Sequence, residues 1–223
     1  MAYFPMFIDI SGKPCLVVGG GRVALRKVQV LLDFEADVTV VAENICEELN
    51  TELSKNICEK LPAELPQKRS AGKILRRKFE PADCIGKFLV IAATDDDELN
   101  RQIAEICREQ GIPVNVVDCL ESSDFIFPSY VKEQNLVAAF SSSGKSPVMT
   151  QYLKEQEKQV LTPFLGEANE LLGTWRIRVQ EQISGEKLRR QAFAEILATC
   201  LETQKLPDEQ QMTDILAKYS KMQ

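Results

Sequence analysis

The feature that most constrains this fold is a glycine run that follows an apolar strand and opens a helix. Residues 13–18 have the pattern of a buried strand, and residues 22–34 have that of an amphipathic helix. In the G-x-G-x-x-A pattern between them, Gly19 permits a tight turn, Gly21 lets the backbone approach a pyrophosphate, and Ala24 lets the helix pack closely. This order predicts a dinucleotide-binding turn. The alternative is a turn that needs glycine for backbone geometry alone.

Strands and helices alternate through the first half of the chain. Alternation of this kind predicts an α/β fold with a Rossmann-type parallel sheet, whose ligand lies at the carboxyl ends of the strands. Beyond the first strand, we expect strands over residues 36–42, 73–79, 88–94 and 113–118, and helices near residues 45–61 and 96–110.

The second half has a different pattern. Two strands, over residues 124–131 and 135–141, are expected to pair antiparallel, and only helices follow. Ser146 and Pro147 are typical of an N-cap and a first helical residue. The sequence therefore predicts a Rossmann domain over residues 1–118, a small α+β region over 119–147 and a helical domain over 148–223.

Composition narrows the choice of partners. The net charge of −6 argues against nucleic acid as the main partner, and an anionic substrate would need a local basic patch. No stretch is long and apolar enough to predict a membrane-spanning helix. The seven cysteines form no C-x-x-C pair, so no metal site is expected and a reducing cytoplasm fits. The apolar start is too short for a signal peptide. The lack of histidine leaves acid–base chemistry to carboxylates, lysine, tyrosine or cysteine.

Two loops that follow strands carry candidate cofactor contacts. Glu43 lies 24 positions after Gly19, near the roughly 20 expected for an acid that binds ribose hydroxyls, although a helix-capping role fits it equally well. No Arg or Lys follows this strand, which favours NAD over NADP. Thr94 ends a central strand and is a further candidate contact, whereas Asp95 to Asp97 are expected to cap the next helix.

Two further loops carry candidate chemistry. Asp118 follows a central strand and faces the crevice of the nicotinamide, where a carboxylate serves as acid or base; a local cap is the alternative. Residues 141–147 combine hydroxyls, Lys145 and a helix start, which suits an anion such as a carboxylate, although a flexible connector fits as well.

Together these segments resemble the precorrin-2 dehydrogenases of sirohaem synthesis, which occur alone or as the N-terminal module of sirohaem synthases. The glycine turn is widespread, but its combination with Asn-Val-Val-Asp and Ser-Ser-x-Gly-x-Ser-Pro segments is more specific. The matching stretches are Phe4–Phe7, Cys15–Lys27, Ala92–Asp97, Asn115–Asp118, Phe125–Ser129 and Ser141–Pro147.

The resemblance implies a cytoplasmic, NAD-dependent enzyme that oxidises precorrin-2 to sirohydrochlorin. It also implies a homodimer built through the strands of residues 119–147, and a tetrapyrrole-binding helical domain over 148–223. Asp118 matches the catalytic aspartate. The expected NAD contacts are Gly19, Gly21, Arg22, Val23, Glu43, Asn44 and Thr94, and the expected substrate contacts are Asn115, Ser142 and Lys145.

Two other functions stay open. Some members of the family also insert iron into sirohydrochlorin, so Fe²⁺ or Co²⁺ is a candidate substrate; Asp118 could strip the pyrrole protons, although the lack of histidine weakens this case. A non-catalytic NAD-sensing module would also show the glycine turn, but it would not need the Asn-Val-Val-Asp and serine-rich segments together. The basic insertion around residues 62–72 has no assigned role.

Overall fold

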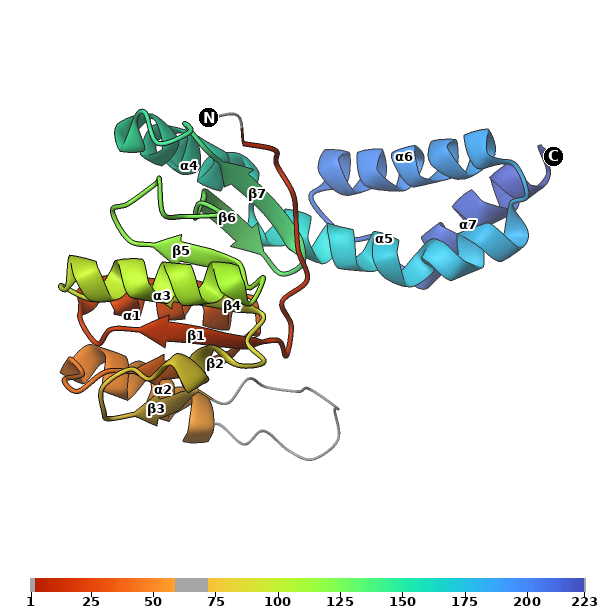
Figure 1. Cartoon of the computed structure of the whole chain (residues 1–223). Helices are drawn as coiled ribbons and strands as arrows, with labels where there is room; N and C mark the ends of the chain where they lie inside the picture. Colours follow the sequence, from red (N-terminus) through yellow and green to blue (C-terminus); the bar gives the residue numbers. More distant parts are fainter. Residues whose placement is uncertain (1–2, 59–71, 223) are drawn as a thin grey trace. The chain divides into compact units, whose positions relative to one another are not determined.

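The structure is a computed structural model that describes residues 3–58 and 72–222 of the chain, without the side chains of residues 55–58. It divides into two compact units, one that ends at Phe127 and one that begins at Pro128 (Figure 1). Each unit is described by itself. The three-part division predicted from the sequence stays a prediction.

The first unit is built on a five-stranded sheet. All neighbouring strands are parallel, and their order is β3-β2-β1-β4-β5, so the predicted α/β fold is confirmed. This order puts the carboxyl ends of β1 and β4 side by side at the centre. The strands are β1 (Pro14–Val18), β2 (Asp37–Val41), β3 (Lys73–Leu75), β4 (Leu89–Ala92) and β5 (Val114–Val116).

Helices cover both faces of this sheet because its strands bury alternate side chains on opposite sides. Cys15 and Val17 of β1 pack with α1 (Arg22–Asp33) and α2 (Glu47–Cys58). Leu16 and Val18 pack on the other face with α3 (Asp97–Glu109). A short 3₁₀ helix, η1 (Pro81–Cys84), precedes β4.

The second unit joins a hairpin to a group of helices. Strands β6 (Ser129–Glu133) and β7 (Leu136–Phe140) pair antiparallel, and α4 (Pro147–Val160) packs against both. Trp175, Ile196 and Leu216 contribute to a separate apolar core of the last three helices. These helices are α5 (Pro163–Gln182), α6 (Glu186–Thr203) and α7 (Glu209–Ser220).

Two predicted strands are wrong in extent. The strand expected over residues 124–131 begins only at Ser129. Asp124 N donates to the Val114 carbonyl at 2.8 Å, but the Asp124 carboxylate accepts from Val114 N at 3.0 Å and so takes the donor that a strand partner would use. The strand expected over residues 73–79 ends at Leu75. The Leu75 carbonyl accepts a hydrogen bond from Arg77 N at 3.0 Å, which closes a tight turn.

The end of the helix predicted near residues 45–61, and the basic insertion that follows it, lie outside the described residues. Among the helices that the structure describes, none combines the length and apolar character that a membrane crossing requires.

Candidate active site

The three glycines of the turn after β1 have different surroundings. Gly19 has a φ of +129°, and a Cβ on it would collide with the carbonyl oxygen of Ala93, which follows β4. A Cβ on Gly20 would collide with the carbonyl oxygen of Asn44, whereas one on Gly21 would meet open space. The turn therefore closes against two neighbouring loops and leaves its last glycine open to a ligand. The close approach at Gly20 was not predicted from the sequence.

The N-terminus of α1 leaves its backbone donors unsatisfied. Gly21 is the N-cap and supplies no side-chain hydrogen bond, and the first turn holds no acidic residue. Helix α3 differs, because the Asp96 carboxylate accepts from Glu98 N and Leu99 N, both at 3.0 Å, as the sequence predicts. The first N–H groups of α1, from Arg22 and Val23, and the positive end of its dipole are thus available to an anion.

The loop after β2 lies against the glycine turn. Cys46 N donates to the Gly20 carbonyl at 2.8 Å, and Asn44 contributes the carbonyl that faces Gly20. Glu43 is exposed, and within the described chain its side chain makes no capping bond to α2, which begins only at Glu47. The carboxylate of Glu43 is therefore free to accept from a ligand.

Thr94 lies two residues after β4, in a small polar network. Its hydroxyl donates to Asn100 Oδ1 at 2.7 Å, and the Asn100 amide donates back to the Thr94 carbonyl at 3.0 Å. Asn100 is one of two buried polar residues in the described chain, and sequence reasoning missed it. This network fixes the loop beside Gly19, and a direct contact of Thr94 with a cofactor stays a prediction.

Asp118 lies at an exposed turn directly after β5. Its φ is +59°, and Cys119 N donates to the Val116 carbonyl at 3.2 Å across the turn. The hydroxyl of Ser123 accepts from Val116 N at 2.9 Å and so fixes the base of the turn. Within the described chain, the Asp118 carboxylate has no hydrogen-bond partner of its own. It is held in place by backbone and stands open to a substrate.

Asn115, in β5, connects the sheet to the segment that follows Asp118. It is 7% exposed, and its side-chain amide donates to the Phe125 carbonyl at 2.9 Å. This bond ties the returning segment, with the Phe125 and Phe127 rings 5.6 Å apart, to the edge of the sheet. The predicted contact between Asn115 and a substrate stays a prediction.

Lys27 is close to this loop, although residues 27 and 118 lie far apart in the sequence. The Lys27 ammonium lies 4.0 Å from the centroid of the Phe127 ring. Burial lowers the pKa of Lys27 below its ordinary value and the charge of Arg26 lowers it further, while the Asp118 carboxylate acts in the opposite direction. Sequence reasoning gave Lys27 no role, since only the fold brings it near Asp118 and Phe127.

Ser142 and Lys145 belong to the second unit, whereas the glycine turn and Asp118 belong to the first. The Ser142 hydroxyl accepts from Ser146 N at 3.0 Å, and Lys145 is exposed. The Ser146 hydroxyl accepts from Met149 N at 3.2 Å, which confirms the predicted N-cap of α4. The loop is thus ordered by its own serines, and its contact with substrate stays a prediction.

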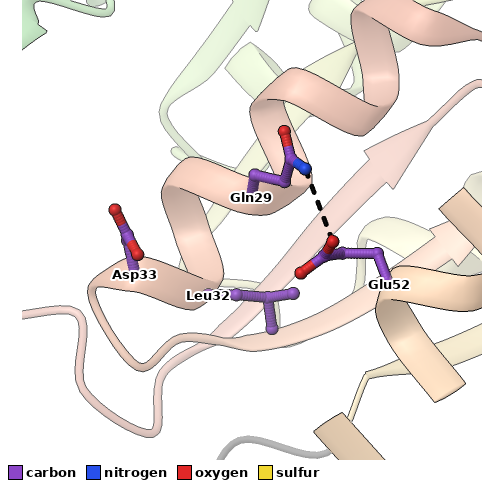
Figure 2. Close-up of a pocket in the computed structure, with 4 residues that line it drawn as sticks. All are labelled: Gln29, Leu32, Asp33 and Glu52. Carbon is purple, nitrogen blue, oxygen red and sulfur yellow. Dashed lines mark hydrogen bonds between the residues drawn. The ribbon is translucent and has the colours of Figure 1, made fainter. Parts of the chain in front are cut away.

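A surface hollow of about 310 Å³ lies elsewhere in the first unit. Gln29, Leu32 and Asp33 line it from the last turns of α1, and Glu52 lines it from α2 (Figure 2). The amide of Gln29 donates to Glu52 across it at 3.4 Å. None of the predicted site residues lines this hollow. Within residues 3–58 and 72–222, no three His, Cys, Asp or Glu side chains are grouped to hold a metal ion.

Known proteins resemble this chain over most of its length. Siroheme synthase of Thioalkalivibrio sulfidiphilus (strain HL-EbGR7) is 39% identical over 197 residues, which cover 88% of this chain and 37% of that protein. Siroheme synthase of Sodalis glossinidius (strain morsitans) is 38% identical over 199 residues, which cover 88% of this chain and 39% of that protein. The chain thus spans about two fifths of the length of the curated relatives it matches.

A solved structure has the same fold. The protein titled "SirC, precorrin-2 dehydrogenase" matches with a TM-score of 0.69 and 21% sequence identity, covering 98% of this chain and all of that one. These likenesses confirm the resemblance predicted from the motifs.

A family model described as "Putative NAD(P)-binding" matches residues 6–129. That span holds the glycine turn, the loop after β2, Thr94 and Asp118, and it covers more than half of the chain. The chain therefore belongs to this NAD(P)-binding family.

Proposed function

We propose that this chain catalyses the NAD-dependent dehydrogenation of precorrin-2 to sirohydrochlorin. The observation that carries the proposal is the 39% identity to a siroheme synthase over 88% of this chain. The site geometry supports it, because an open glycine turn and an exposed carboxylate occur in the same unit at the carboxyl ends of parallel strands.

The residues of the glycine turn fit a dinucleotide. A pyrophosphate would contact the backbone at Gly21 and the N–H groups of Arg22 and Val23, where no side chain or cap competes. The Glu43 carboxylate would accept from the ribose hydroxyls. Residues 42–46 contain no Arg or Lys for a 2′-phosphate, which supports NAD. When bound, NAD supplies the two-electron acceptor that takes a hydride from the substrate.

Asp118 supplies the proton acceptor. Oxidation of precorrin-2 removes two electrons and two hydrogens, one as hydride to the cofactor and one as a proton. The Asp118 carboxylate, which has no hydrogen-bond partner in the described chain, would take that proton and later release it to water. The backbone bonds of its turn would hold it toward the substrate, and orientation of this kind is a large part of what such a site contributes.

A second copy of the chain is the proposed protein partner. In the described chain taken alone, α4 buries none of its side chains, and Val148, Met149 and Tyr152 are 79%, 54% and 58% exposed. The two-stranded β6–β7 sheet also leaves strand edges open for pairing. An exposed apolar helix beside open strand edges supports a homodimer built through this region.

The six cysteines whose side chains are described are all free thiols, which supports a cytoplasmic location.

Iron insertion is a second candidate activity. The observation in its favour is that the similar proteins are named siroheme synthases, because sirohaem is the iron complex of sirohydrochlorin. Asp118 would then accept protons from the pyrrole nitrogens as Fe²⁺ or Co²⁺ enters. A metal ion that is a substrate needs no resident ligand cluster.

The test is an anaerobic assay of the purified chain with precorrin-2. The visible spectrum of sirohydrochlorin is expected to appear, with NADH, only when NAD is present. A later spectral change on adding Fe²⁺ or Co²⁺, and faster than without protein, would show metal insertion. Tight NAD binding without turnover would contradict the proposal and favour an NAD-sensing module instead.

A further inference from the structure

Lys27 has hydrogen-bonding capacity that the described chain does not use. Its side chain is half-buried, and its ammonium lies 4.0 Å from the Phe127 ring centroid. No described carboxylate lies within ion-pair distance of the ammonium, and no described residue accepts a hydrogen bond from it. Three N–H donors are thus held beside the Asp118 turn without an acceptor.

The surroundings of Lys27 keep this ammonium in one place. Phe127 attracts it through the face of its ring, which limits the freedom of a side chain that otherwise extends into water. Phe127 is itself placed by the bond between Asn115 and the Phe125 carbonyl and by packing against Phe125. The same segment between β5 and β6 carries Asp118, so Lys27 and Asp118 are both positioned by this segment.

The charge of Lys27 calls for an anion. The whole chain carries a net charge of −6, which repels an anionic ligand at long range, so capture depends on local cations. Burial lowers the pKa of Lys27, and an anion brought against the ammonium would restore the stability of its charged form. The ammonium lies over Phe127, in the segment that also carries Asp118, so an anion bound there would meet this cation.

We infer that Lys27 binds a carboxylate of the substrate and so sets which edge of the macrocycle faces Asp118. The inference rests on the proposed function, because precorrin-2 carries acetate and propionate side chains around its rim. A carboxylate would accept from the ammonium, while the Phe127 ring supports the opposite side of the cation. Lys27 is then a specificity residue for an anionic, rim-carboxylated substrate.

A cofactor phosphate is the other anion that Lys27 could meet. Lys27 is the sixth residue of α1, so its backbone lies about 8 Å along the axis from the first helical residue, where a pyrophosphate is expected. Its ammonium lies over the Phe127 ring, in the segment between Asp118 and β6, and this placement favours the substrate.

The experiment compares Lys27→Met with Arg26→Met. Each change removes one positive charge from α1, and methionine is an unbranched side chain of similar length to lysine. Arg26 is exposed and makes no hydrogen bond within the described chain. We expect Lys27→Met to raise the KM for precorrin-2 about tenfold or more, while the KM for NAD changes less than twofold. Lys27→Arg should recover part of the loss, and Arg26→Met should resemble the wild type.

The outcomes separate this inference from the proposed function. If the wild type oxidises precorrin-2 but Lys27→Met and Arg26→Met give the same KM for it, the carboxylate contact is wrong and the function stands. A rise in the KM for NAD alone would assign Lys27 to the cofactor phosphates and overturn the inference. A wild type without turnover would overturn both. Thermal unfolding of each variant shows whether a loss comes from misfolding instead.

Discussion

At the scale of single residues, Gly19 and Gly21 differ in what surrounds their α-carbons. Gly19 combines a left-handed φ with a backbone carbonyl in the place of a Cβ, whereas Gly21 has neither constraint. The first glycine is therefore needed to fold the turn, and the last is needed only for what approaches it. A substitution at each position separates folding from binding.

We expect Gly19→Ala to destabilise the chain by about 3 kcal/mol, since it adds backbone strain to a collision with Ala93. Gly21→Ala should cost at most about 1 kcal/mol, yet it should weaken NAD binding about tenfold by blocking the pyrophosphate. Denaturant unfolding and calorimetric titration with NAD measure the two effects. A Gly21→Ala chain that binds NAD as tightly as the wild type would place the phosphates elsewhere.

Asp118 can be tested without disturbing its turn. Asn tolerates a φ of +59° as well as Asp does, so Asp118→Asn keeps the backbone but removes the proton acceptor. We expect precorrin-2 turnover to fall about 10²-fold or more, with NAD affinity unchanged. Glu121→Gln removes an exposed carboxylate from the same loop and serves as the control. Equal turnover in the two variants would remove Asp118 from the reaction.

At the scale of elements, the sequence pattern predicts most helices and strands. Apolar residues that repeat every two positions indicate the buried face of a strand, and those that repeat about every 3.6 positions indicate the buried face of a helix. Prediction fails where a side chain takes a backbone donor: the Asp124 carboxylate accepts from Val114 N, in a segment that the alternating pattern assigns to a strand. It also fails for the neighbourhood of Lys27, since Phe127 and Asp118 reach that residue only through the crossover of the sheet. The positions of Gly19, Gly21 and Asp118 in the loops after β1 and β5 could be predicted from the strand pattern, whereas their roles stay predictions.

The contact between α6 and α7 gives a pH-dependent prediction. Glu195 accepts from Lys218 Nζ at 2.6 Å and from the Tyr219 hydroxyl at 2.8 Å, and these bonds lower the pKa of Glu195 below 4.5. The stabilisation is therefore present above pH 4.5 and is lost as the pH falls through the lower pKa of the folded state.

Glu195→Gln is accordingly expected to lower the unfolding midpoint by about 2 °C at neutral pH, and by less in acid. Scanning calorimetry from pH 7 to pH 3 measures the difference. Glu202→Gln, an exposed change on the same helix, should show no such trend. A difference that stays constant down to pH 3 would mean that the Glu195 charge contributes nothing.

At the scale of the whole molecule, the exposed apolar side of α4 predicts self-association. Val148→Glu places a charge where Val148 is 79% exposed in the single chain, so it should leave the monomer folded and shift the dimer toward monomer. Light scattering after size-exclusion chromatography measures the mass. Gln180→Glu adds the same charge at an exposed position of α5, outside α4, and should remain dimeric. A wild type that is monomeric at all concentrations would refute the proposed partner.

In the proposed homodimer, the stability of the fold would depend on the protein concentration. A second copy that covers α4 binds only the folded chain, so association draws the folding equilibrium toward the native form by mass action. Each tenfold dilution toward the dissociation constant of the dimer would then lower the contribution of dimerisation to the free energy of unfolding. In a dilute sample the hairpin and α4 are expected to loosen first, while the parallel sheet, whose core is internal to one chain, keeps its order.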